Sequence, residues 1–231
     1  MPHRMLIPSI EQRLSHFMDL TEKATQQAEK EAKKKLTITI SREFGCGGYP
    51  VAEKLQRILE ERTGEPWSLM DKALIEEVAK DHGLLERVLA KLGEKSRVVD
   101  DIVSTLSPRW LTEGDYYRLL CRQIVALAAE GNVIIVGRGA SIITQSFENC
   151  FHFRLFGSMK FKTEYISRRL SLSQEQADTL VHEKQRERDA FICDFLSCDA
   201  KDLKYYHIAF NSDKIPSDGI AKVIADYVVQ K

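Results

Sequence analysis

The sequence predicts an α/β fold in which helices flank a doubly wound parallel sheet. Val133 to Val136 is an entirely β-branched run without polar alternation, which is typical of an inner strand buried on both faces. Leu36 to Ile40 is a second strand candidate, and segments of helical periodicity alternate with these and further short strands. Glycine turns follow both runs, at residues 45–48 and 137–139. Because ligands of such sheets bind at the carboxyl ends of the strands, we expect both turns to border one ligand site.

The first glycine turn joins a strand to a helix. Gly45, Gly47 and Gly48 permit positive φ and lack the Cβ atoms that would hold a ligand away from the backbone. Pro50 suits the first position of a helix, whose apolar residues recur at helical spacing until Gly64. A strand, a glycine loop and a helix N-terminus form the arrangement that cradles phosphate, although the same glycines also suit a plain tight turn.

This turn departs from the P-loop pattern G-x-x-x-x-G-K-[ST]. When the two are superposed, Arg42 stands at the first glycine and Gly48 at the lysine. Tyr49 or Pro50 stands at the hydroxyl residue that would bind magnesium. The cradle is kept, but the groups that neutralise the β- and γ-phosphates are missing. The guanidinium of Arg42 can take the place of the lysine, and a salt bridge to Glu43 or to a helix acid is the alternative.

Caps and periodicity predict the remaining elements. Asp71 and Ser158 are expected to cap helices, and Ser173 forms a capping box with Gln176 at the start of another. For Asp71 a helix cap is favoured over a magnesium contact. Further strands are expected at 67–70, 151–156 and 207–211, and further helices at 84–106 (in two parts), 116–130 and 220–228. The helices near 84–106 form an insertion between sheet strands, which is the usual place for a subdomain that covers the substrate.

Residues 1–35 precede the first strand. Ser9 and Gln12 form a capping box, and a short apolar stripe fades after Thr21 into charged and small residues. We interpret this segment as one long helix, either docked on the core or solvated, with a partner-binding arm as the alternative. Because its stripe is short, we expect the core to fold without it.

Composition excludes several classes of protein. Lys and Arg together number 34, as do Asp and Glu, so the net charge is zero and bulk DNA or RNA binding is not favoured. No apolar run approaches the ~20 residues that cross a membrane. The five cysteines lack C-x-x-C spacing, which argues against a disulfide scaffold or zinc site and favours a reduced cytoplasmic setting. The sequence leaves open whether the chain forms a homodimer.

Four segments together resemble the cytidylate-kinase-like family of P-loop proteins, relatives of the nucleoside monophosphate kinases. They are Ile38 to Gly48, the helix start at Asp71-Lys72, Asn132 to Ala140, and Tyr206 to Asp213. The resemblance covers about residues 36–230 and implies a P-loop kinase-like sheet. The domains expected are an N-terminal helical extension over 1–35 and a P-loop kinase-like domain over 36–231, with a helical insertion at about 71–130 and a lid at about 171–205.

The resemblance also implies roles for single residues, with ATP and Mg²⁺ as donor and cofactor and no direct metal ligand assigned. Donor phosphates are expected on the first loop, at Ser41, Gly45, Cys46, Gly47, Gly48 and Tyr49. Phosphoryl transfer depends on positioned cations, and the candidates are Arg42, Arg138, Arg154, Arg168, Arg169, Lys184, Arg186 and Arg188. Among them, the expected catalytic residues are Arg42, Arg186 and Arg188. The acceptor is expected at Asp71, Arg138, Lys184 and Asp189. Gly139 stands where cytidylate kinases carry an aspartate, which leaves base and sugar recognition open. A thiol at a helix N-terminus also predicts a lowered pKa for Cys46.

Two functions from different classes are compatible with these observations. The first is a kinase that transfers a phosphoryl group from ATP to a nucleoside monophosphate such as CMP or a related acceptor. The second is a catalytically degenerate module that binds a nucleotide or anion and regulates a partner, which the missing lysine and hydroxyl favour. A dinucleotide-dependent oxidoreductase is excluded because the glycines are not spaced G-x-G-x-x-G.

Overall fold

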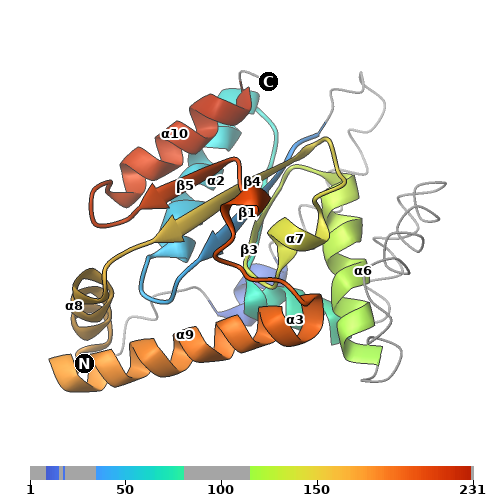
Figure 1. Cartoon of the computed structure of the whole chain (residues 1–231). Coiled ribbons are helices and arrows are strands. Elements are labelled where there is room, and N and C mark those ends of the chain that lie inside the picture. The colour runs from blue at the N-terminus through green and yellow to red at the C-terminus, as the bar shows by residue number, and fades with distance from the viewer. Residues whose placement is uncertain (1–8, 16–17, 19–34, 81–114, 230–231) are drawn as a thin grey trace.

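A computed structural model describes residues 9–15, 18, 35–80 and 115–229 of the chain (Figure 1). The two helices predicted across residues 84–106 lie outside the described residues. Residues 10–15 are helical, and the predicted capping box is present, since the amide of Gln12 donates to Ser9 Oγ at 3.2 Å and that of Ser9 to Gln12 Oε1 at 3.3 Å.

The described strands form one parallel sheet in the order β2-β3-β1-β4-β5, which confirms the predicted α/β fold. The strands are β1 (Thr37–Arg42), β2 (Ser68–Met70), β3 (Val133–Val136), β4 (Cys150–Phe156) and β5 (Ile208–Asn211). β1 lies at the centre, with Ile38 paired with Ile134 of β3 on one side and with Phe151 of β4 on the other. Arg42, the last residue of β1, therefore emerges between the ends of its two neighbours.

Helices cover both faces of this sheet (Figure 1). They are α2 (Gly48–Thr63), α3 (Lys72–Lys80), α6 (Asp115–Glu130), α7 (Ala140–Ile143), α8 (Met159–Leu170), α9 (Gln174–Leu196) and α10 (Ser217–Val229), with a 3-10 turn η2 (Leu203–Tyr205). On one face α2 and α10 pack against Ile38 and Ile40, and on the other α3 and α6 pack against Val133 and Ile135. The long helix α9 lies across the lower end of the molecule in Figure 1, and its Phe191 packs against the second of these cores.

The predicted helix caps are present. Asp71 Oδ1 accepts from the amide of Leu74 at 3.1 Å, and Ser158 Oγ from that of Phe161 at 3.2 Å. Ser173 forms its capping box at the start of α9. One boundary differs from the prediction, because α2 begins at Gly48 rather than at Pro50. Gly47 adopts left-handed dihedrals as its N-cap, so the glycines themselves make the turn into the helix.

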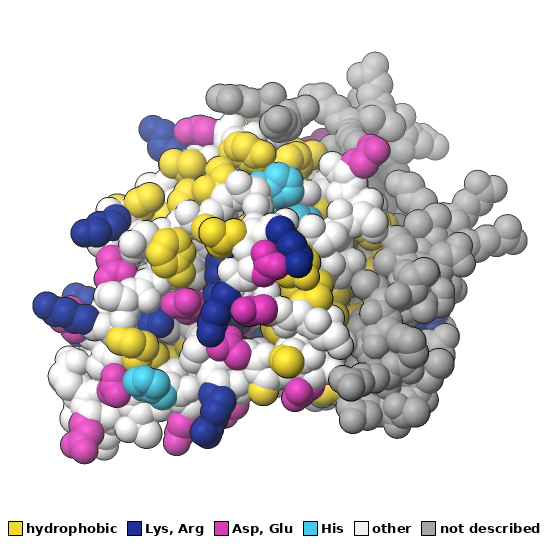
Figure 2. Space-filling view, in the orientation of Figure 1, with side chains coloured by type: hydrophobic (Ala, Val, Ile, Leu, Met, Phe, Trp, Pro, Cys, Tyr) yellow, Lys and Arg dark blue, Asp and Glu magenta, His cyan; other side chains and the backbone are white. Residues whose placement is uncertain are grey.

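No helix among the described residues is long and apolar enough to cross a membrane. On the face shown in Figure 2, lysine and arginine side chains are interspersed with acidic ones instead of gathering in one basic patch. The cations that matter for the site lie instead in a cavity at the carboxyl end of β1.

Candidate phosphate-binding site

The loop between β1 and α2 is held by a buried charge cluster. Glu43 accepts from Lys162 Nζ at 2.9 Å and from the amide of Gly157 at 3.4 Å, and Arg154 lies 3.7 Å from its other oxygen. A Cβ at Gly45 would stand only 2.8 Å from Lys162 Cβ, so this approach requires glycine. The loop is thereby fixed with the N-terminus of α2, and its positive dipole end, at the carboxyl edge of the sheet.

Cys46, in this loop, is an inert thiol. Its side chain is buried, and burial together with the charge of Glu43 raises its pKa to about 12. The prediction of a lowered pKa is therefore wrong, because desolvation outweighs the helix dipole. Cys46 is available to a phosphate through its backbone only.

Arg42 crosses from the end of β1 to the second glycine turn. Its aliphatic stem packs on Gly48, where a Cβ would lie 2.9 Å from Arg42 Cγ, and a Cβ at Gly137 would overlap its guanidinium. Burial lowers the pKa of Arg42 well below its usual value, and the charges of Arg188 and Arg138 lower it further. The predicted salt bridge to Glu43 is not formed, since Glu43 is bound by Lys162 and Arg154.

The second turn, Gly137 to Gly139, places Arg138 beside Arg42. All three residues have positive φ (86°, 53° and 71°), so Arg138 itself is held in a left-handed conformation that costs free energy. Its Nε lies 3.3 Å from Glu76 Oε1 of α3, and its Cζ lies 4.3 Å from the centroid of the Phe191 ring. Such strain concentrates at functional sites.

Helix α9 supplies two further cations, Lys184 and Arg188. Arg188 lies over the Phe44 ring, with Cζ at 5.1 Å from the centroid, and its Nη1 is buried without a hydrogen-bond partner. Burial and the neighbouring charge of Arg138 lower its pKa to about 10. Gln185, one turn before, accepts from the amide of Phe44 at 2.8 Å. The helix is thus joined directly to the loop between β1 and α2.

The end of β1, the second glycine turn, α7 and α9 line a cavity of about 400 Å³, within the range of small-molecule sites. The residues of the first glycine loop, Gly45 to Gly48, are not part of its lining. Its charged lining side chains are six cations and two acids: Arg42, Lys72, Arg138, Arg154, Lys184, Arg188, Glu187 and Asp189. Glu187 is bound to Lys184 at 2.7 Å, and Asp189 accepts from Gln185 at 2.7 Å. The cavity therefore carries an excess of positive charge.

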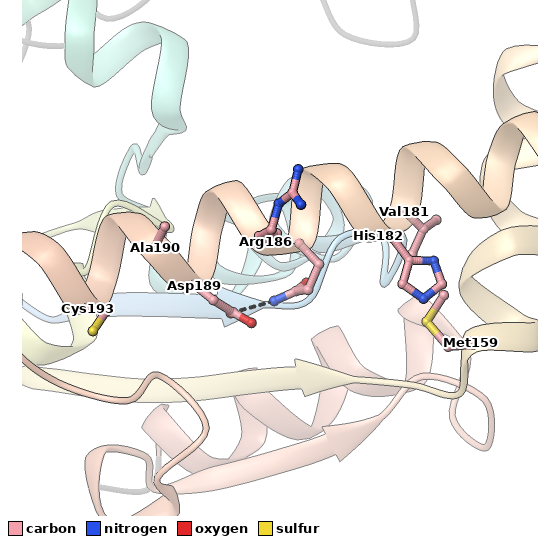
Figure 3. A pocket seen from close by; sticks show the side chains of 8 residues that line it. Met159, Val181, His182, Arg186, Asp189, Ala190 and Cys193 are labelled. Carbon is pink, nitrogen blue, oxygen red and sulfur yellow. Dashed lines mark hydrogen bonds between the residues drawn. The ribbon is translucent and has the colours of Figure 1, made fainter.

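Some predicted site residues lie together in this cavity and others do not. Arg42, Arg138, Lys184, Arg188, Asp189 and Ser41 line it, whereas Arg186 does not. Arg186 is exposed and lines a separate open groove on α9 with His182 and Cys193 (Figure 3). Residues 186 and 188 are two positions apart, and such positions point to different sides of a helix, which charge alone does not reveal.

Asp71 and Tyr49 lie just outside the cavity lining. Asp71 caps α3 and forms an ion pair with Arg13, and the Arg13 guanidinium also lies over the Tyr49 ring at 5.4 Å. The predicted cap at Asp71 is confirmed. Its predicted contact with the acceptor stays a prediction.

Arg154, one of the candidate cations from the sequence, lines the cavity, although no catalytic or binding role was assigned to it. Arg154 is buried, donates from Nη1 to Ser41 Oγ at 3.2 Å and lies 5.6 Å from the centroid of the Tyr206 ring. The Tyr206 hydroxyl lies 3.1 Å from the same Ser41 oxygen. Its place towards the end of the predicted strand 151–156 was the sequence signal.

A protein-family model matches most of this chain. The model of the cytidylate kinase-like family matches residues 37–214. The chain belongs to this family. The predicted resemblance is thereby confirmed, and residues 9–15 and 18 of the described chain lie outside the matched range. No curated protein matches the chain.

Solved structures with similar folds add little about function. An uncharacterized protein from Eubacterium ventriosum has a TM-score of 0.66 and 25% identity, covering 86% of this chain and 100% of its own. Shikimate kinase from Bacteroides thetaiotaomicron has a TM-score of 0.43 and 11% identity, covering 84% and 98%. Shikimate kinase from Acinetobacter baumannii in complex with shikimate has a TM-score of 0.34 and 15% identity, covering 85% and 94%. The two shikimate kinases are too remote to argue from.

The site of this family member fits nucleotide phosphates better than it fits a directly bound Mg²⁺ ion. The glycine loop and the start of α2 leave room for phosphate oxygens against backbone N–H groups. The carboxylates of the described site, in contrast, are already engaged with cations or amide donors: Glu43, Asp71, Glu76, Glu187 and Asp189. Tyr49 replaces the hydroxyl ligand of a P-loop. Among the described residues no cluster of three metal-ligating side chains occurs.

Proposed function

We propose that the protein is a phosphotransferase that moves the γ-phosphoryl group of a nucleoside triphosphate such as ATP to a phosphate-bearing acceptor. A nucleoside monophosphate of the CMP type is the acceptor that the family membership supports. The observation that carries the proposal is the pair Arg42 and Arg188. Both side chains are half-buried and lie next to the loop between β1 and α2, and the charge of Arg188 lowers the pKa of Arg42.

Such a pair requires an anion. In the described part of the chain, neither Arg42 nor Arg188 forms an ion pair, and Nη1 of Arg188 lacks any hydrogen-bond partner. Buried like charges destabilise a fold unless a ligand compensates them. A phosphate chain accepts forked hydrogen bonds from guanidinium groups and supplies that compensation.

The geometry suggests how the reaction would proceed. An oxygen of the acceptor phosphate attacks the γ-phosphorus, the bond from phosphorus to the bridging oxygen breaks, and the nucleoside diphosphate leaves with the electron pair. The loop amides hold the donor phosphates. Arg42 lines the cavity and packs on Gly48 at the end of this loop, so it can stabilise charge that moves between donor and acceptor. Arg138, Lys184 and Arg188 face the acceptor cavity. A metal ion would add further charge neutralisation, but the described carboxylates at the site, Glu43, Asp71, Glu76, Glu187 and Asp189, are already bound to cations or amide donors.

A regulatory anion-binding module is the second candidate. Tyr49 at the hydroxyl position and Gly48 at the lysine position favour it, because both changes remove groups used in transfer. Such a module would bind an anion at the same site as the kinase but would not catalyse phosphoryl transfer. The cytoplasmic setting is part of the proposal and is supported by the cysteines, all five of which lie in the described part of the chain with free thiols.

Titration calorimetry and a turnover assay test the proposal. ATP is titrated with and without Mg²⁺, followed by CMP, and formation of nucleoside diphosphates is measured by chromatography. Arg188→Met is expected to weaken ATP or CMP binding by about tenfold or more, since one charged hydrogen-bonding group is lost. Arg186→Met on the same helix is the matched comparison and is expected to change binding by less than about twofold.

The outcomes separate the candidates. Binding with turnover supports the kinase, and binding without turnover for any nucleoside monophosphate supports the regulatory module. Absence of binding by any nucleotide, or an equal loss in the two arginine variants, would contradict the site as assigned here.

A further inference from the structure

Arg13 reaches the phosphate site from outside the family domain. Its Nη2 forms an ion pair with Asp71 Oδ1, and its guanidinium lies over the ring of Tyr49, with Cζ at 5.4 Å from the centroid. Both partners lie at the N-terminus of a helix beside the site: Tyr49 is the second residue of α2, and Asp71 directly precedes α3. The side chains of Arg13 and Asp71 are 10% and 15% exposed, so the ion pair is largely shielded from water.

The contact belongs to a docked element. Leu14, next to Arg13 on the helical segment 10–15, packs against the hydrophobic core that includes Met70 and Leu74. Met18 packs against the same core, one turn further along. Arg13 is thus held at the site by apolar contacts as well as by its own charge.

A short row of contacts joins Arg13 to Arg42. Arg42 packs on Gly48, which is the neighbour of Tyr49. The Arg13 guanidinium lies over the Tyr49 ring and binds the Asp71 carboxylate. Lys72, the residue after Asp71, lines the cavity together with Arg42. The charge of Asp71 reaches Arg42, since it acts to raise the pKa of that guanidinium against the effect of burial. A carboxylate released from Arg13 would act more strongly on Arg42, because no bound guanidinium would offset its charge.

We propose that Arg13 is a positioning residue of the phosphate site, which binds the Asp71 carboxylate and thereby leaves Arg42 uncompensated for a phosphate ligand. The inference rests on the proposed function only in requiring that Arg42 binds phosphate. It gives the segment before the family domain a part in ligand binding rather than in packing alone. Without Arg13, Asp71 competes with the ligand for Arg42.

Asp71→Asn provides a test that leaves the helix cap in place. Asn is as good an N-cap as Asp, so this substitution removes the charge and keeps the bond to the amide of Leu74. Arg13→Met removes the other charge and keeps most of the aliphatic stem that packs at the site. The pair of variants therefore separates charge from folding.

The experiment measures binding of inorganic pyrophosphate to the full chain by titration calorimetry, in the wild type, Arg13→Met, Arg13→Lys, Asp71→Asn and the Arg13→Met/Asp71→Asn double variant. Thermal unfolding checks that each variant is folded, and Arg13→Gln replaces Arg13→Met if the latter has no cooperative transition. We expect Arg13→Met to raise Kd by about tenfold, or about 1.4 kcal/mol, and Arg13→Lys to stay within roughly threefold of the wild type. The double variant is expected to bind as Asp71→Asn does.

Two outcomes would overturn the inference alone, and a third would overturn the proposed function with it. A Kd of Arg13→Met equal to that of the wild type would overturn the inference and leave the proposed function standing. A double variant as weak as Arg13→Met would also overturn it, because Arg13 would then act directly on the ligand or through the fold. If the wild type does not bind pyrophosphate, the proposed function itself fails, and the role of Arg13 fails with it.

Discussion

Arg138 shows how a single residue can serve both the fold and a ligand. It is held at φ 53° between two glycines, with Glu76 on one side and the Phe191 ring on the other. Both neighbours are compatible with a structural brace that links β3, α3 and α9. The strained conformation, and its place on the wall of a cationic cavity, are what a ligand-binding arginine would require.

Arg138→Lys separates these two roles. Lysine keeps the charge near Glu76 but loses the forked geometry of guanidinium, so binding of a nucleoside monophosphate should weaken by about 1–3 kcal/mol. ATP binding and the free energy of unfolding should change little. Calorimetric titration of both ligands gives the answer, and a fall in stability with unchanged affinities would identify Arg138 as a brace.

His152 makes the stability of the fold depend on pH. It is buried in β4, with Nδ1 at 2.8 Å from Thr39 Oγ1, and its backbone amide donates to His207 Nδ1 at 2.9 Å. Burial, with a smaller effect from the charge of His207, lowers the pKa of His152 from 6.5 to about 4. The unfolded chain therefore binds more protons than the folded one between these two values, and stability falls as the pH falls through that window.

Lowering the pH from 7 to 5 should cost about 2 kcal/mol through this one group. Urea unfolding at the two pH values measures the loss, and His152→Gln, which does not titrate, provides the comparison. Carboxylates contribute equally to both proteins, so the variant should lose less stability than the wild type over this interval. Equal losses would show that His152 is protonated in the folded state without cost.

At the scale of elements, glycines set the geometry around Arg42. Gly48 has no positive φ, and it is the first residue of α2. A Cβ at this position would lie 2.9 Å from Arg42 Cγ and would displace that side chain. The glycine is therefore needed for the approach of Arg42 to the helix and not for the helix itself.

Gly48→Ala should weaken binding while the free energy of unfolding stays nearly unchanged. Alanine favours a helix over glycine by about 0.5–1 kcal/mol, which offsets the cost of moving Arg42. ATP binding should weaken severalfold because the guanidinium leaves its place. The same substitution in an Arg42→Met background should cause no further loss, and an additional loss there would show that the methyl group blocks the phosphate itself.

Local signals predicted most elements, and contacts between elements decided the site. Three helix starts could be predicted from their N-caps, Ser158, Ser173 and Asp71, because an N-cap depends only on the next few residues. The pKa of Cys46 was mispredicted, since its burial is set by distant packing. The distinction between Arg186 and Arg188 required knowing which side of α9 faces the sheet. Arg154 was a candidate cation without an assigned role for a similar reason, because its partners Ser41 and Tyr206 come from other strands and loops.

At the scale of the whole molecule, the segment before the family domain is tied to the core. Leu14 and Met18 pack against the core cluster formed by α3, α6 and β3, and Arg13 forms its ion pair with Asp71. The expectation that residues 1–35 contribute little to folding rested on the shortness of their apolar stripe. The packing of these three side chains gives a reason to expect a measurable contribution.

Deleting residues 1–35 should therefore lower stability without abolishing the cooperative transition. Two half-buried apolar side chains and one shielded ion pair together contribute about 2–3 kcal/mol. At this chain length each kcal/mol shifts Tm by about 2–4 °C, so the truncated chain should melt roughly 5–10 °C lower. Differential scanning calorimetry measures the shift, and Leu14→Ala compared with Glu11→Ala, an exposed position on the same helix, tests its origin. A truncated chain that melts within about 2 °C of the full one, or equal effects of the two alanine variants, would show that the segment lies against the core without stabilising it.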